Sequence, residues 1–139
     1  MTSTPTATLS HSPAQQTEAN RAIAIEFLRR ASAGHAREVM RRYAAPTFAH
    51  HNPYFANDAD TLATAMDENA RATPDKVLDI QRTIAEGSFV VAHSRVQQKP
   101  GDAPIAVVHI FRIEDGRIHE LWDVAQPAPV DSPNQAGMF

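Results

Sequence analysis

Residues 105–126, IAVVHIFRIEDGRIHELWDVAQ, contain two runs of β-forming residues joined by a short link that includes Gly116. A glycine-containing link of this length favours an antiparallel hairpin, because glycine suits the backbone of a tight turn. Two earlier runs, residues 77–86 and 89–98, have the same character and follow one another through a similar link. We therefore predict four strands that form an antiparallel meander.

The sequence before the meander has helical spacing instead. We predict one helix from Glu18 to a stop at Gly34, a short second helix over residues 36–43 that Pro46 ends, and a third that ends before Pro74. The apolar stripes behind this prediction are Ile23, Phe27 and Ala31; Val39, Met40 and Tyr43; and Leu62, Met66 and Ala70. Helices followed by a meander predict an α+β fold, a cone whose N-terminal helices pack on the concave face of a curved, mostly antiparallel sheet. The open end of such a cone is a pocket.

Length and composition predict one domain. The chain has 139 residues, 42% of them hydrophobic, which suits a single core. We predict a disordered arm over residues 1–16, a single domain over residues 17–139, and an extended tail over residues 127–139 at its end. Met138 and Phe139 are expected to pack against the body of the domain.

Several classes of protein are excluded by composition. The net charge is −3 with no basic stripe, so no nucleic-acid partner is expected. The absence of cysteine excludes disulfides and thiolate catalysis. The sequence shows neither an apolar run of membrane-spanning length nor a secretory signal, so we expect a cytoplasmic protein without membrane association. No phosphate-cradling loop is present, and no cofactor is expected.

Asp123 is the most unusual residue of the predicted sheet. It lies between Trp122 and Val124 inside a strand pattern, where aspartate is depleted. A carboxylate in such a place has a hydrogen-bonding partner or a chemical role. The sequence fits both a structural aspartate and a catalytic one.

Two histidines also lie on apolar strand faces. Alternation places His93 on one face with Phe89 and Val91, and it gives His109 apolar neighbours two residues away on each side. A single histidine in such a position is usually a satisfied core residue. Two of them on neighbouring strands favour a site, so we take both as candidates.

A third candidate histidine comes from FAHHNPYF, residues 48–55. His50 and His51 are adjacent, so they point in opposite directions in an extended segment. Pro53 stiffens the segment, and Asn52 can bond its own backbone, which suits the presentation of one histidine at a pocket rim. We predict that His51 faces the pocket and His50 the solvent. The alternative is a turn with incidental histidines.

These stretches resemble the SnoaL-like polyketide cyclases, and more closely a small bacterial branch named for predicted aldol-condensation activity. The resemblance covers residues 18–139 and is carried by HNP at 51–53, FRIEDGRI at 111–118, WDVAQP at 122–127 and the terminal GMF. It implies membership of the NTF2-like superfamily, with ketosteroid isomerases and limonene epoxide hydrolases. It also implies an α+β cone with a pocket at its open end and a homodimer.

The resemblance implies roles for individual residues. By motif, the general acid/base falls on Asp123, and supporting roles fall on His51 and His93. An acidic residue is expected in many relatives where His109 stands, so the histidine changes the charge of the pocket and leaves the assignment of acid and base open. The apolar residues expected to contact the substrate are Tyr54, Phe55, Phe111, Leu121 and Trp122.

The implied chemistry is proton transfer next to the carbonyl of a small apolar compound. Asp123 would take a proton from the carbon alpha to the carbonyl, and His51, His93 or His109 would donate to the enolate oxygen. Aldol condensation, cyclisation or isomerisation could follow. The alternatives are water activation by Asp123, as in an epoxide hydrolase or hydratase, and binding of an apolar ligand without chemistry. The least favoured alternative is a metal site made of these four residues, which lack a typical ligand spacing.

Overall fold

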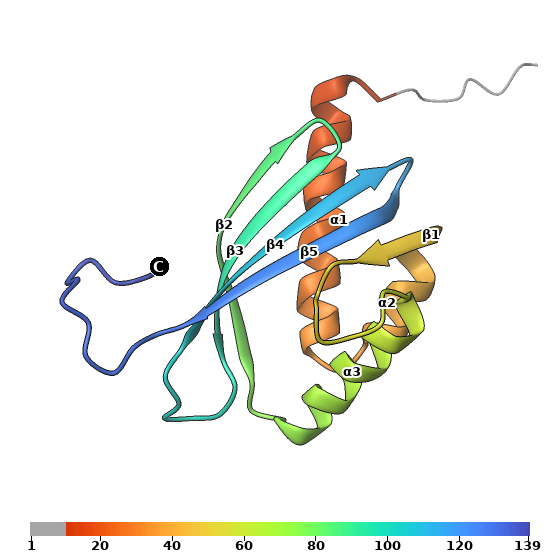
Figure 1. Cartoon of the computed structure of the whole chain (residues 1–139). Helices are drawn as coiled ribbons and strands as arrows, with labels where there is room; N and C mark the ends of the chain where they lie inside the picture. The colour runs from red at the N-terminus through yellow and green to blue at the C-terminus, as the bar shows by residue number, and fades with distance from the viewer. Residues whose placement is uncertain (1–10) are drawn as a thin grey trace, which may run out of the picture.

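The computed structural model describes residues 11–139, which form three helices and five strands. Their order is α1 (Pro13–Ser32), α2 (Ala36–Tyr43), β1 (Ala44–His50), α3 (Ala59–Ala72), β2 (Val77–Glu86), β3 (Phe89–Gln97), β4 (Ile105–Glu114) and β5 (Arg117–Pro127). The helices lie on one side of a strongly twisted sheet (Figure 1). The predicted α+β class is confirmed.

The sheet is the predicted meander with one additional strand. Its order is β1-β5-β4-β3-β2, in which β2 to β5 are antiparallel and β1 runs parallel to β5. The sequence analysis missed β1 because it is rich in alanine and contains Pro46, so it lacks an alternating apolar pattern. Proline is tolerated there because β1 is an edge strand and Pro46 is exposed. The strand carries the following loop, residues 51–58, to the side of β5.

The first helix begins earlier than predicted. Ser12 caps it, since its hydroxyl accepts from the Gln15 N–H at 3.2 Å and the Gln15 side chain accepts from the Ser12 N–H at 2.9 Å. Pro13 suits the first turn, where no intrahelical donor is needed. The predicted boundary of the arm at residue 16 is therefore wrong, because residues 13–16 are helical. Residues 1–10 of the predicted arm lie outside the described part of the chain.

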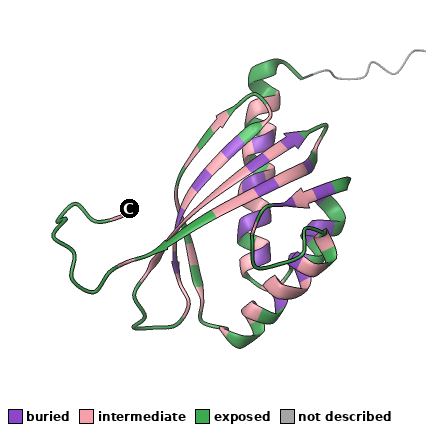
Figure 2. Cartoon of the chain, viewed as in Figure 1, coloured by how far each residue is buried: buried purple, intermediate pink, exposed green. Residues whose placement is uncertain are grey.

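The core lies between α1 and the inner face of the sheet. The ring of Phe27 from α1 meets the ring of Phe111 from β4 edge to face, with centroids 5.6 Å apart. Both are fully buried, as are Val90, Ile113 and Ile118. Buried and less buried residues alternate along these strands (Figure 2). Truncation of one such aromatic residue to alanine typically costs about 3–5 kcal/mol, so this contact fixes α1 on the sheet.

The orientation of β3 corrects one prediction. Its buried residues are Val90, Ala92, Ser94 and Val96, so they form the inner face. His93 therefore lies on the outer face, and the prediction that it faces the pocket is wrong. Both faces of β3 are apolar enough to be buried, and the smaller residues lie inside because α1 packs closely over them.

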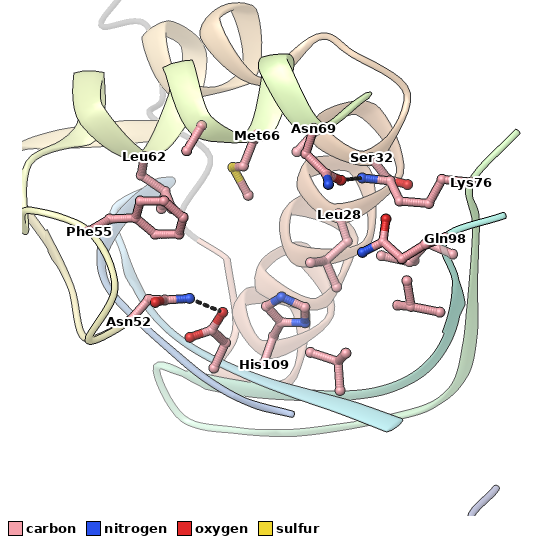
Figure 3. Close-up of a pocket in the computed structure, with 16 residues that line it drawn as sticks. Leu28, Ser32, Asn52, Phe55, Leu62, Met66, Asn69, Lys76, Gln98 and His109 are labelled. Atoms are coloured by element: carbon pink, nitrogen blue, oxygen red, sulfur yellow. Dashed lines mark hydrogen bonds between the residues drawn. The ribbon is translucent and has the colours of Figure 1, made fainter. Parts of the chain in front are cut away.

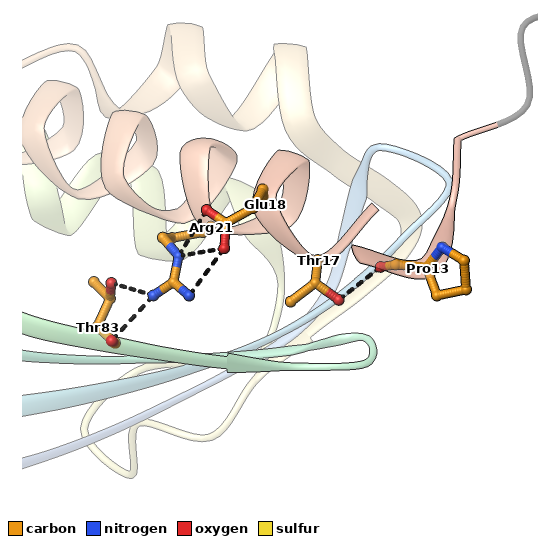
Figure 4. Close-up of polar contacts among 5 residues, drawn as sticks. All are labelled: Pro13, Thr17, Glu18, Arg21 and Thr83. Atoms are coloured by element: carbon orange, nitrogen blue, oxygen red, sulfur yellow. Dashed lines mark hydrogen bonds and ion pairs between the residues drawn. The ribbon is translucent and has the colours of Figure 1, made fainter. Parts of the chain in front are cut away.

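Two neighbouring polar residues of α1 tie the helix to the sheet. The buried amide of Asn20 donates to the carbonyls of Gly87 and Ile113, at 3.4 and 3.3 Å. Arg21 donates to the carbonyl and hydroxyl oxygens of Thr83, at 3.0 and 2.7 Å, and pairs with Glu18 on its other side (Figure 4). These bonds fix how far α1 can slide along the sheet.

The C-terminal tail returns to the outer face of the sheet. The ring of Phe139 stacks on His93 with centroids 6.0 Å apart, and the Arg95 guanidinium lies 5.7 Å from the same ring. The expectation that Phe139 packs against the body is confirmed. Within residues 11–139, no helix has the length and apolar character needed to cross a membrane.

Candidate active site

A pocket of about 310 Å³ lies between α1, α3 and the inner face of the sheet. This volume suits a small molecule. Leu28, Leu62, Met66, Val96 and Val107 form much of its apolar wall. Figure 3 shows Asn52 on one side of the pocket and Asn69, Lys76 and Gln98 on the other. Asp123 belongs to the Asn52 side, because it is bonded to Asn52 and pairs with His109 in the sheet.

Asn52 holds the carboxylate of Asp123. Its Nδ2 donates to Asp123 Oδ2 at 3.0 Å, and its Oδ1 accepts from the Tyr54 N–H at 3.0 Å. The second bond fixes which way the amide points, because only its oxygen can accept from a main-chain donor. The loop itself is anchored to β5 by the bond from the His51 N–H to the Leu121 carbonyl, 2.9 Å. Asp123 is thus oriented from two elements, with Oδ1 free of any partner among the described residues.

His109 lies beside Asp123 on the adjacent strand, since the two residues are partners in the β4–β5 ladder. Its Nδ1 is enclosed and has no hydrogen-bond partner within residues 11–139. Burial lowers the pKa of His109 to about 4, and the charge of Asp123 opposes this shift. The ring is therefore neutral at physiological pH, with a nitrogen available to a ligand.

The two histidines of FAHHNPYF lie opposite to the prediction. His50 is 4% exposed and has both ring nitrogens engaged. Its Nε2 donates to the Ala56 carbonyl at 2.6 Å, and its Nδ1 accepts from the Asn52 N–H at 3.2 Å. The prediction that His51 faces the pocket is wrong, because His51 stacks on Trp122 with centroids 4.8 Å apart on the other side of the sheet. Alternation along β1, which was not recognised as a strand, buries His50 and turns His51 outward.

The residues predicted to contact substrate are divided between the two faces. Phe55 lines the pocket, whereas Leu121 lines a separate small cavity of about 20 Å³ that shares Asp123 with the pocket. Phe111 is on the same face, with its ring centroid 6.2 Å from that of His109. It is fully buried in the core and does not line the pocket. Tyr54 is 86% exposed and outside the pocket, and Trp122 is on the outer face, so both predictions are wrong.

The four residues considered as a possible metal site do not come together in the structure. His51 and His93 lie on the outer face, whereas His109 and Asp123 lie on the inner one. In the described part of the chain, no three histidine, aspartate or glutamate side chains come together as a set of metal ligands. His93 instead contacts Arg82 and the tail.

Comparison with known families settles what kind of domain carries this site. The model of the SnoaL-like domain matches residues 24–121, which is more than half of the chain. The chain belongs to the SnoaL-like family. The match ends just before Asp123, so the role of this aspartate does not follow from the match itself. None of the curated proteins matches this SnoaL-like chain in sequence.

Solved structures show that the SnoaL-like chain has the NTF2-like fold. A candidate polyketide cyclase from Bacillus cereus has a TM-score of 0.69 and 18% identity, covering 83% of this chain and 78% of its own. A candidate ketosteroid isomerase from Kribbella flavida has a TM-score of 0.66 and 19% identity, covering 86% and 87%. An NTF2-like protein of unknown function from Cytophaga hutchinsonii has a TM-score of 0.62 and 15% identity, covering 77% and 89%.

Several pocket residues of this SnoaL-like chain were missed by the sequence analysis. Asn52 was noticed only for its bond to its own backbone, although it lies in the HNP triplet. Lys76 and Gln98 lie one position outside β2 and β3. Alternation groups them with Leu78 and Val96, but it does not say that this set is the inner one. Asn69 lies on α3 one turn after Met66, and its helical spacing was the available signal.

Proposed function

We propose that this chain is a cofactor-independent enzyme that removes a proton from the carbon alpha to the carbonyl of a small apolar compound, with Asp123 as the base. The observation that carries the proposal is the held carboxylate. Asp123 Oδ2 accepts from Asn52 at 3.0 Å, whereas Oδ1 has no partner among the described residues and Asp123 lines the pocket. A base fixed in this way can approach one carbon of a bound ligand without first reorienting.

The second half of the reaction needs a donor for the enolate oxygen. His109 lies next to Asp123, is neutral because its pKa is about 4, and has an unpartnered Nδ1. In the tautomer with a proton on Nδ1, it donates to the oxygen as negative charge develops there. A neutral imidazole also places no positive charge beside the carboxylate of Asp123.

The fate of the enolate defines the reaction class. Addition to a second carbonyl gives aldol condensation or cyclisation, and return of the proton to another carbon gives isomerisation. Membership of the SnoaL-like family supports this range, as do fold relatives described as candidate cyclases and ketosteroid isomerases. The apolar wall of Leu28, Leu62, Met66 and Val107 favours an apolar substrate body.

We also propose that two copies pair through the outer face of the sheet. Val77, Ile84, Phe89 and Val124 are large apolar residues on this face with 44–68% of their surface exposed. Near one end of this face, the ring of Phe89 lies 6.5 Å from that of the half-buried Trp122, which stacks on His51. Exposed apolar side chains on one face of a sheet are typical of an association surface.

The test is deuterium exchange at the alpha carbon of small ketones and 1,3-dicarbonyls in D₂O, followed by NMR. We expect exchange by the wild type and a loss of at least about 100-fold in Asp123→Asn, the range for removal of a general base. Glu120→Gln is the matched control, because it makes the same chemical change three residues away on the outer face, where Glu120 pairs with His51 at 2.8 Å. Its exchange rate should stay within about twofold of the wild type. Equal loss in both variants, or no exchange by folded wild type, would overturn the proposal.

A further inference from the structure

The end of the pocket remote from Asp123 is formed by Lys76 and Gln98. Val77 of β2 and Gln97 of β3 are partners in the ladder, so the residues just outside them are neighbours. Alternation puts Lys76 on the same face as Leu78, and Gln98 on the same face as Val96, and all four line the pocket. The two polar residues thus continue the inner row just past the paired ends of β2 and β3 (Figure 3).

Lys76 carries a half-buried ammonium group without an acidic partner. It makes no ion pair with any residue between 11 and 139, and its Nζ donates to the neutral Asn69 Oδ1 at 2.7 Å. Desolvation lowers the pKa of Lys76. A lysine that is withdrawn from water is normally paired with a carboxylate, because desolvation of a lone charge is costly. The ammonium keeps two further donors for a ligand.

Gln98 adds a second unfilled polar group at the same place. Its Oε1 is enclosed and has no hydrogen-bond partner in the described part of the chain. Buried amides normally have partners, so an orphaned amide on a residue that lines a pocket is not held in place and can turn toward a ligand. Rotation of the amide by half a turn brings Nε2 to the place of Oε1, so the group can donate as well as accept.

The charges of the pocket give a bound molecule a direction. Among residues 11–139, Lys76 is the one cationic residue that lines it and Asp123 the one anionic residue. They lie at opposite ends, because Asp123 is bonded to Asn52, which Figure 3 shows across the pocket from Lys76. An anionic group on a ligand is attracted to the first and repelled by the second. A carboxylate suits the lysine end best, since it accepts from several donors at once and the donors there are Lys76, Asn69 and Gln98.

We propose that Lys76, Asn69 and Gln98 bind a carboxylate, and that the substrates of this chain are keto acids whose carbonyl lies at the Asp123 end and whose carboxylate lies at the Lys76 end. The position of the carbonyl rests on the proposed function. The carboxylate site does not, because it follows from the unpaired ammonium and the orphaned amide alone.

The test is binding, measured by isothermal titration calorimetry with 5-oxohexanoate, 7-oxooctanoate and 9-oxodecanoate, each compared with its primary amide. We expect the wild type to bind the best keto acid about tenfold more tightly than its amide, the effect of one charged hydrogen bond. Lys76→Met should abolish this preference. Gln98→Glu, which places a negative charge beside the site, should weaken the acid and leave the amide unchanged.

Two control variants distinguish the carboxylate site at Lys76 from the proposed proton transfer at Asp123. Lys99→Met removes the same charge from an exposed lysine beside Gln98 and should keep the preference. Asp123→Asn should also keep it, even though it is expected to stop alpha-carbon exchange. Equal binding of acid and amide by the wild type, no binding of either series, or a preference that survives Lys76→Met would each overturn the proposal, whatever the exchange assay shows.

Discussion

The buried neutral ring of His109 makes the stability of the domain depend on pH. Burial lowers the pKa of His109 from 6.5 to about 4 in the folded state. Above pH 6.5 the ring is neutral in both the folded and the unfolded chain, and it contributes no pH dependence. As the pH falls below 6.5, the unfolded chain binds a proton that the folded chain excludes, so stability falls by about 1.4 kcal/mol per pH unit. The loss reaches about 3 kcal/mol at pH 4 and levels off below it, where the folded state also takes up the proton.

The assay is urea unfolding followed by circular dichroism between pH 7.5 and 4. His109→Gln removes the titrating group. The free energy of unfolding of this variant should therefore fall less steeply with decreasing pH than that of the wild type, whatever its value at pH 7.5. His35→Gln, a change at an exposed histidine, is the matched control and should follow the wild type. If His109→Gln loses stability with pH as steeply as the wild type, the reasoning from burial is refuted.

Three further changes test other parts of the structure. Asn52→Ala removes the only protein donor to Asp123 within residues 11–139, and we expect alpha-carbon exchange to fall about tenfold or more in kcat/KM while the fold is kept, the loss of one hydrogen bond to a charged group. Asn20→Leu removes the donor to the buried Ile113 carbonyl and to the partly buried Gly87 carbonyl, and it should lower the free energy of unfolding by about 1–3 kcal/mol, measured in urea. Val124→Lys puts a charge on the apolar outer face and should convert the proposed dimer to a monomer in light scattering, without change in circular dichroism.

The meander and the helices could be predicted because each depends on short-range pattern. Alternation and glycine links identified β2 to β5, and helical spacing identified the three helices. β1 could not be identified, because its stability comes from pairing with β5 and from the burial of Phe48 and His50 rather than from its own composition. Its parallel partner is about 70 residues away in the chain, so no local signal marks it.

The predictions of site residues were correct where strand alternation alone decides which residues share a face. They were wrong where a choice between the two faces of the sheet was needed. Asp123 and His109 share the inner face with Leu121 and Phe111, and the sequence suggested this pairing. His93 and His51 were assigned to the wrong face, since strand alternation relates residues to each other but does not say which set meets the helices. That choice depends on how closely α1 can approach Ala92 and Ser94, which only the packed structure reveals.

The two ends of the pocket differ in how freely they can change. Asp123 lies inside the β4–β5 ladder, where one inserted residue would turn it to the opposite face. Lys76 and Gln98 lie just beyond the paired residues of β2 and β3, next to connections that tolerate changes in length. New ligand preferences can therefore evolve, or be selected in a library over residues 74–76 and 98–103, while the held carboxylate stays in place.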